Sequence, residues 1–158
     1  MCSGKSLFVY DERGFEEKKR ITFEGSGYDL TFYNDWILVG LSNGNVVVLD
    51  KTNYSIVFTS KLFDHYIRNI RMLKNNDIAL ATSGGLFFAK IDNKSIQLID
   101  QSFAQGKNIY FYNEIETNEG YIVFLNNTSP YRLCLADRVS GKCIDLHNED
   151  GLISVLKY

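Results

Sequence analysis

The hydrophobic residues of this chain occur in short runs, most of them five to seven residues long and rich in β-branched and aromatic side chains. Runs of this length and composition predict β-strands. Turn-forming pairs such as Asn43-Gly44 and Ser140-Gly141 separate the runs, and no window shows the spacing of an amphipathic helix with capping residues. The pattern therefore predicts an all-β chain. The clearest runs are 6–10, 36–39, 46–49 and 121–125.

The strands recur at a nearly constant interval. A run that ends in aspartate is repeated at spacings of 39, 42 and 45 residues, and a turn containing serine and glycine precedes the first three copies. A unit of about 40 to 45 residues with four short strands is typical of one blade of a β-propeller. We therefore expect a β-propeller-like array of four-stranded antiparallel blades. The aspartates that mark the repeat are Asp11, Asp50, Asp92 and Asp137.

The repeat divides residues 1–158 into about three full blades with a partial blade at each end. We expect a single domain that is either part of a larger propeller or an open arc completed by another chain. An open arc leaves strand edges unpaired, and such edges favour self-association. The expected limits are the third and fourth strands of a blade at 5–23, full blades at 28–60, 66–102 and 107–146, and one first strand at 152–158.

The last repeat also resembles a known family. Residues 136–147 contain an aspartate, a Ser-Gly-Lys-Cys turn, an outer strand and then His147, in the order of a WD repeat, and His65 holds the same repeat position 82 residues earlier. The chain is thus similar to a WD-repeat propeller in which the Trp-Asp pair reads Leu-Asp, Ile-Asp or Ala-Asp. This resemblance implies a scaffold for protein–protein interaction.

The charge balance limits the partners. Lysine and arginine number 17 and aspartate and glutamate number 19, which gives a formal net charge of −2. Such a chain offers no general attraction for nucleic acid or an anionic membrane, and no segment has the roughly 18 uncharged apolar residues of a membrane-spanning helix. We expect protein partners, no nucleic acid and no membrane. The start of the chain has no signal-peptide pattern, so the expected location is the cytoplasm, with the nucleus as the alternative.

Three cysteines, an odd number, favour free thiols over a disulfide framework in a chain of this size. Cys134 and Cys143 are predicted on neighbouring strands. Whether they share a face of the sheet depends on the strand register, which the sequence does not fix to one residue.

No complete catalytic, cofactor or metal motif is found in the sequence. Gly4-Lys5-Ser6 lacks the earlier glycine and the following helix of a phosphate-binding loop, and the two histidines are expected to be structural. We expect a non-catalytic protein without a cofactor or a metal. Two alternatives stay open: a ligand-sensing or enzymatic propeller with an axial site, and a truncated propeller without independent function.

Aromatic residues alternate along two of the predicted first strands. Tyr28, Phe32 and Tyr33 lie on one of them, and 110–112 is the matching aromatic run on the other. Alternation of this kind is typical of core residues, so we expect these side chains in the core.

The loops before the first strand of each blade, at 26–29, 63–68, 105–108 and 148–151, are the expected binding face. Loops on a rigid scaffold commonly carry binding residues. The candidate residues for protein binding mix aromatic and basic side chains, as interface hot spots do. They are Phe63, His65, Tyr66, Arg68, Lys107 and Tyr110.

Overall fold

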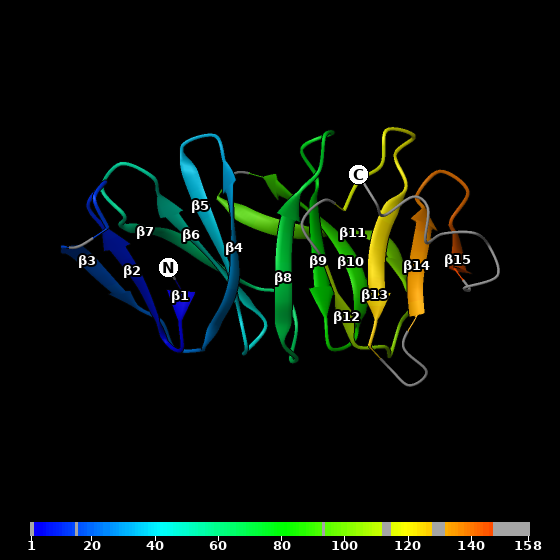
Figure 1. Ribbon diagram of the computed structural model, residues 1–158, viewed down its shortest axis with the longest axis horizontal. Helices are drawn as coiled ribbons and strands as arrows, with labels where there is room; N and C mark the ends of the chain where they lie inside the picture. The colour runs from blue at the N-terminus through cyan, green and yellow to red at the C-terminus, as the bar shows by residue number, and fades with distance from the viewer. Residues whose placement is uncertain (1, 15, 93, 112–114, 128–131, 147–158) are drawn as a thin grey trace.

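The chain forms an arc of antiparallel β-sheets, shown in Figure 1. The computed structural model describes residues 2–14, 16–92, 94–111, 115–127 and 132–146. Within these ranges every regular element is a β-strand, and the strands form one three-stranded sheet and three four-stranded sheets. The hydrogen-bonded order of the strands follows their order in the sequence, so each sheet is a simple meander.

The sheets are numbered in chain order. The first contains β1 (Cys2–Ser3), β2 (Ser6–Tyr10) and β3 (Glu17–Thr22). The second contains β4 (Gly27–Tyr33), β5 (Trp36–Leu41), β6 (Asn45–Asp50) and β7 (Ile56–Lys61). The third contains β8 (Ile67–Met72), β9 (Ile78–Thr82), β10 (Gly85–Asp92) and β11 (Ser95–Phe103). The fourth contains β12 (Ile109–Tyr110), β13 (Ile122–Asn126), β14 (Arg132–Asp137) and β15 (Lys142–Leu146).

The prediction of an all-β array of four-stranded antiparallel blades is confirmed, and each full sheet begins and ends within two residues of its predicted limits. The first sheet has one strand more than the two predicted within 5–23. This strand, β1, pairs Cys2 with Leu7 and Ser3 with Ser6 around a tight turn. The strand predicted at 152–158 lies outside the described residues.

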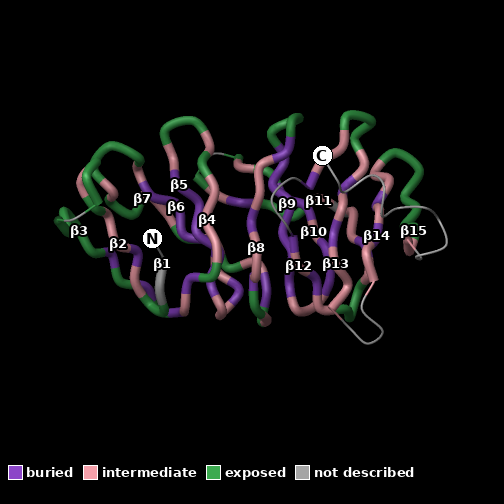
Figure 2. The backbone as a smooth tube through the Cα atoms, in the orientation of Figure 1, coloured by how far each residue is buried: buried purple, intermediate pink, exposed green. Residues whose placement is uncertain are grey.

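The two edges of the arc carry different connections. In the three four-stranded sheets, the hairpin turns after the first and third strands lie along the upper edge in Figure 1, here called the turn rim. The turns after the second strands of the second and third sheets, the turn between β1 and β2, and the connections between sheets lie along the lower edge, here called the loop rim. Figure 2 shows that the turns of the turn rim are mostly exposed. The turn rim comprises 34–35, 51–55, 73–77, 115–121 and 138–141, and the loop rim comprises 23–26, 42–44, 62–66, 83–84 and 104–108.

The core lies between neighbouring sheets. All five residues of β9 are buried, and their side chains alternate between two clusters. Ile78 and Leu80 pack in a cluster with Leu38 of the second sheet, whereas Ala79 belongs to a cluster with Phe124 of the fourth. A strand that is apolar on both faces is therefore explained by burial against a sheet on each side.

The loop rim repeats one backbone contact between successive sheets. The carbonyl oxygens of Gly4, Gly44 and Gly84, spaced 40 residues apart, each accept a hydrogen bond from an amide in, or directly after, the next connection along the chain. Gly44 has a φ of 79°, and a Cβ there would lie 1.9 Å from the carbonyl oxygen of Phe63. The backbones are thus in direct contact at this edge. The three donors are Gly27 at 2.8 Å, Leu62 at 3.0 Å and Gly106 at 2.8 Å.

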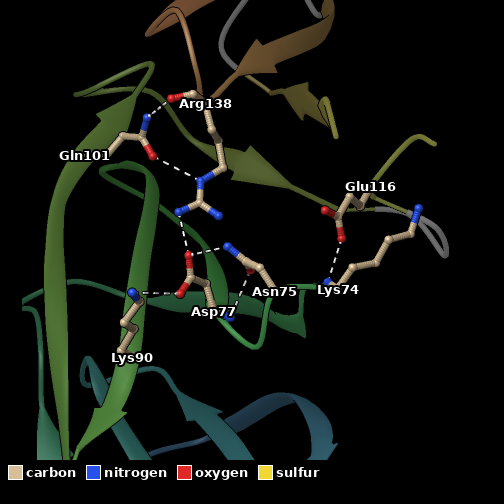
Figure 3. Close-up of polar contacts among 7 residues, drawn as sticks. All are labelled: Lys74, Asn75, Asp77, Lys90, Gln101, Glu116 and Arg138. Carbon is tan, nitrogen blue, oxygen red and sulfur yellow. Dashed lines mark hydrogen bonds and ion pairs between the residues drawn. The ribbon is translucent and has the colours of Figure 1, made fainter. Parts of the chain in front are cut away.

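The turn rim is joined by a side-chain cluster between the third and fourth sheets, drawn in Figure 3. Arg138 Nη2 donates to Asp77 Oδ2 at 2.6 Å, and Lys90 Nζ lies 3.7 Å from Asp77 Oδ1. Arg138 Nε in turn donates to Gln101 Oε1 at 3.0 Å. The Asp77 side chain is only 3% exposed, so its charge depends on these cations for compensation.

The register of β14 and β15 settles the arrangement of two cysteines. Cys134 pairs with Asp145, two residues beyond Cys143, so both cysteine side chains lie on one face. The two thiols are free, and Cys134 Sγ donates to Asp145 Oδ1 at 3.0 Å. Burial raises the pKa of both thiols. The prediction of free thiols is thus confirmed for Cys134, which is buried, and for Cys143, which is exposed.

Candidate functional site

β-Bulges aim two polar side chains at the start of the first strands. The register of β4 with β5 shifts between Gly27 and Asp29, and the register of β8 with β9 shifts between Ile67 and Asn69. The inserted residues are Tyr28 and Arg68, which have the same place in successive sheets. A bulge bends its strand and redirects the extra side chain. Both residues lie where their strands leave the loop rim.

Arg68 lies among three tyrosines from three consecutive segments. Its guanidinium carbon is 5.9 Å from the ring centroid of Tyr28, 5.6 Å from that of Tyr66 and 5.0 Å from that of Tyr110. These distances allow cation–π attraction. The rings of Tyr28 and Tyr66 are 6.2 Å apart and tilted by 47°. We call Tyr28, Tyr66, Arg68 and Tyr110 the tyrosine–arginine cluster.

One hydrogen bond orients the Arg68 side chain and leaves the rest of its donors available. Arg68 Nε donates to Asn108 Oδ1 at 2.8 Å. No acceptor among the described residues forms a hydrogen bond or an ion pair with Nη1 or Nη2. Tyr28 and Tyr66 are 49% and 47% exposed, so the cluster is open to solvent. Lys107, also exposed, adds a second positive charge next to Asn108.

The structure brings together only part of the predicted candidate set. Tyr66, Arg68 and Tyr110 form the cluster, with Lys107 beside it in sequence. Phe63 is only 8% exposed, and its ring packs against the rings of His65 and Phe87. Phe63 thus packs within the loop, and the half-buried His65 packs against it.

The His65 side chain is hydrogen-bonded to β9. Its Nε2 forms a 3.1 Å hydrogen bond with Thr82 Oγ1, and Thr82 Oγ1 donates to the carbonyl oxygen of Gly85 at 2.8 Å. Thr82 is fully buried. Burial lowers the pKa of His65, because the charged imidazolium is poorly solvated there. His147, at the equivalent repeat position, lies outside the described residues.

A pair of Asx residues braces the first strands behind the cluster. Asp29 Oδ2 accepts a hydrogen bond from the Ile70 amide at 3.1 Å, and Asn69 Oδ1 accepts one from the Phe111 amide at 3.0 Å. Asp29 and Asn69 occupy equivalent positions 40 residues apart, each directly after the bulge. Asp29 also forms an ion pair with Arg71. These contacts fix the spacing of the strands that carry the cluster.

The expectation that all the alternating aromatics lie in the core is wrong at two positions. Tyr28 and Phe32 are 49% and 57% exposed, whereas Phe111 is buried as expected. The bulge at Tyr28 interrupts the regular alternation of β4, which explains the first exception. The signal in the sequence was the equivalence of Tyr28 with Arg68, one repeat later. Residue 112 lies outside the described residues.

Apart from the tyrosine–arginine cluster, a hollow lies between the first and second sheets. It has a volume of about 320 Å³ and an apolar lining that includes Phe8, Tyr10, Leu30 and Phe32. Lys51 also lines the hollow, and its Nζ atom lies 5.7 Å from the centroid of the Phe32 ring. None of the predicted candidate residues lines this hollow.

Neither a metal-binding cluster nor a membrane-spanning helix is found among the described residues. No cluster of three or more histidine, cysteine, aspartate or glutamate side chains in this part of the chain could hold a metal ion. Within the same ranges, no helix has the length and apolar character needed to cross a membrane.

Comparison with known proteins supports the fold. No protein-family model and no curated protein matches the chain. Among solved structures, Kuenenia stuttgartiensis hydrazine synthase has a TM-score of 0.71 at 14% identity, over 90% of this chain and 44% of that one. The β-propeller domain of Myceliophteria thermophila Cps50 (Swd1) has a TM-score of 0.63 at 15% identity, over 79% and 42%. The Dos1 propeller has a TM-score of 0.57 at 16% identity, over 91% and 40%.

These likenesses define the architecture of the chain. Two of the three similar structures are propellers by description, and the four meandering sheets pack side by side as blades. The chain therefore has the fold of a partial β-propeller. It spans less than half the length of each of these structures.

Proposed function

We propose that this protein is a non-catalytic protein-interaction module of the WD-repeat type and that it binds its partner at the tyrosine–arginine cluster. The observation that carries the proposal is the convergence of exposed Tyr28 and Tyr66 with Arg68 and Tyr110. Tyrosine and arginine are enriched among residues that dominate binding energy at protein interfaces.

The scaffold supports this role because it holds the cluster in one geometry. Hydrogen bonds to the glycine carbonyls hold the loop rim together, and hydrogen bonds to Asp29 and Asn69 hold the first strands in place. A preorganised surface loses less conformational entropy when a partner binds. The large aromatic rings add contact area with few rotatable bonds.

A ligand-sensing or enzymatic propeller is the competing function. The Nη groups of Arg68 favour it, since they have no acceptor among the described residues and offer donors to a small anion as well as to a protein. One similar structure is an enzyme by name, but its likeness of 14% identity concerns the fold alone. The two functions differ in whether binding requires a macromolecular surface.

Affinity capture with matched variants tests the proposal. The bait is the wild-type protein, and the test variant carries Tyr66→Ala with Arg68→Ala. The control variant carries Phe32→Ala with Lys51→Ala, which removes another exposed aromatic–cation pair, near the turn rim. We expect the test variant to lose partners that the wild type and the control variant retain.

Both variants are first compared with the wild type by urea unfolding, so that lost binding is not a consequence of lost structure. Equal capture by the wild type and the test variant would contradict binding at the cluster. Turnover or tight binding of a small molecule without any protein partner would favour the competing function.

A further inference from the structure

We propose that the tyrosine–arginine cluster binds a carboxylate side chain of an extended acidic peptide segment in the partner. This inference rests on the proposed function and names the chemistry of the partner.

One hydrogen bond within the chain holds the Arg68 guanidinium in a fixed orientation. Asn108 Oδ1 occupies the Nε donor of Arg68 at 2.8 Å. The Nη1 and Nη2 atoms then present the end of the planar fork, whose parallel N–H groups match the two oxygens of a carboxylate. The described part of the chain supplies no acceptor to either atom.

The surrounding rings strengthen this interaction. Tyr28, Tyr66 and Tyr110 replace part of the water around the guanidinium, and a charge-assisted hydrogen bond is stronger where water is excluded. The ring faces also offer contact area to residues that flank the carboxylate in the bound segment. The hydroxyl groups of Tyr28 and Tyr66 form no hydrogen bond with described residues.

Arg20 shows how this chain satisfies a stacked arginine elsewhere. Its guanidinium carbon lies 4.7 Å from the ring centroid of Phe8, and its Nε and Nη2 donate to the two oxygens of Glu17 at 3.1 and 2.9 Å. Arg68 likewise lies against aromatic rings, but no carboxylate of the described residues binds its guanidinium. The arginines of the described residues that contact a carboxylate of the chain are Arg20 with Glu17, Arg71 with Asp29, Arg132 with Asp145 and Arg138 with Asp77.

Charge favours a peptide over a nucleic acid as the source of the anion. The formal net charge of the chain is −2. The loop rim also carries an exposed carboxylate, Asp64, whose Oδ1 atom lies 3.3 Å from Lys61 Nζ. A polyphosphate backbone needs several cations along its path. The cluster offers one guanidinium, which suits a single carboxylate.

An NMR titration tests the inference. The probe is the blocked peptide Ac-Gly-Glu-Leu-Glu-Gly-NH2, and the matched probe is the same peptide with both glutamates replaced by glutamine. We expect the acidic peptide to shift the Arg68 Nε–H signal and the tyrosine ring signals, with an affinity about tenfold higher than that of the glutamine peptide. Arg68→Gln should abolish the difference between the peptides.

Two further variants separate binding from folding. Arg68→Lys retains the charge but loses the planar fork, so it should bind the acidic peptide more weakly than the wild type. Arg20→Gln removes a stacked arginine whose fork is already occupied, and it should leave the titration unchanged. The amide spectrum of each variant shows whether it is folded.

Equal affinity for the two peptides, or an unchanged acid preference in folded Arg68→Gln, would overturn the inference. Tighter binding of a thymidine oligonucleotide than of the acidic peptide would overturn it as well. If affinity capture succeeds through the cluster while the acid preference fails, the proposed function stands and only the partner chemistry is wrong.

Discussion

Replacing Asn69 with alanine should weaken the joint between the third and fourth sheets. The substitution removes the Oδ1 atom that accepts the Phe111 amide at 3.0 Å. It also removes the Nδ2 donor that lies 3.3 Å from Asp29 Oδ2. The Asp29 carboxylate keeps its hydrogen bond from the Ile70 amide and its ion pair with Arg71, so the orphaned Phe111 amide is the main loss.

The size of the effect follows from that amide. Leaving one buried donor without an acceptor costs about 1–3 kcal/mol, and the long bond to Asp29 contributes little. We therefore expect Asn69→Ala to lower the free energy of unfolding by about 2 kcal/mol. A change of that size reduces the ratio of folded to unfolded protein by a factor of roughly 30.

Urea unfolding followed by far-UV circular dichroism measures the loss of stability, and amide hydrogen exchange locates it. The Phe111 amide should exchange faster in Asn69→Ala. The control is Asn118→Ala, an exposed turn residue whose change should stay within about 0.5 kcal/mol. Equal stability of Asn69→Ala and wild type, together with unchanged protection of the Phe111 amide, would refute the bracing role.

Four other substitutions test the fold. Arg138→Met should cost about 3 kcal/mol in urea unfolding, because it leaves the buried Asp77 carboxylate with weaker compensation; a loss under 1 kcal/mol would contradict this. Gly44→Ala should prevent stable folding, whereas Gly141→Ala, at a φ of 72° with open space around it, should cost only about 1 kcal/mol in a thermal melt. The pKa of His65 is lowered in the folded state, so protonation favours the unfolded chain and stability should fall below about pH 6.5. His65→Asn should show a shallower decline between about pH 7 and pH 5, and equal slopes would contradict the assignment.

The strands and their grouping into sheets were predictable because apolar runs and turn residues are local signals. The turn at Asn43-Gly44 separates two such runs, and the structure has a turn between β5 and β6 there. The repeat then divided the strands into blades, since aspartates at a constant interval mark equivalent strands. Local chemistry and periodicity were therefore sufficient for the architecture.

The candidate site was only partly predictable because it depends on register. One inserted residue in β4 exposes Tyr28, which regular alternation assigns to the core. Phe63 has the residue type of an interface hot spot, but its burial depends on Phe87 in another strand. The environment of Arg68 combines residues from three sheets, which the sequence separates by about 40 positions each.

The constant glycine spacing of the loop rim has a practical consequence for insertions. The connections between sheets on that rim are four or five residues long, at 23–26, 62–66 and 104–108. The turns between the first and second strands, on the opposite rim, lengthen from two residues at 34–35 to five at 73–77. The turn at 117–120 lies on the side away from these backbone contacts, so it is a suitable place to graft a tag or a foreign epitope.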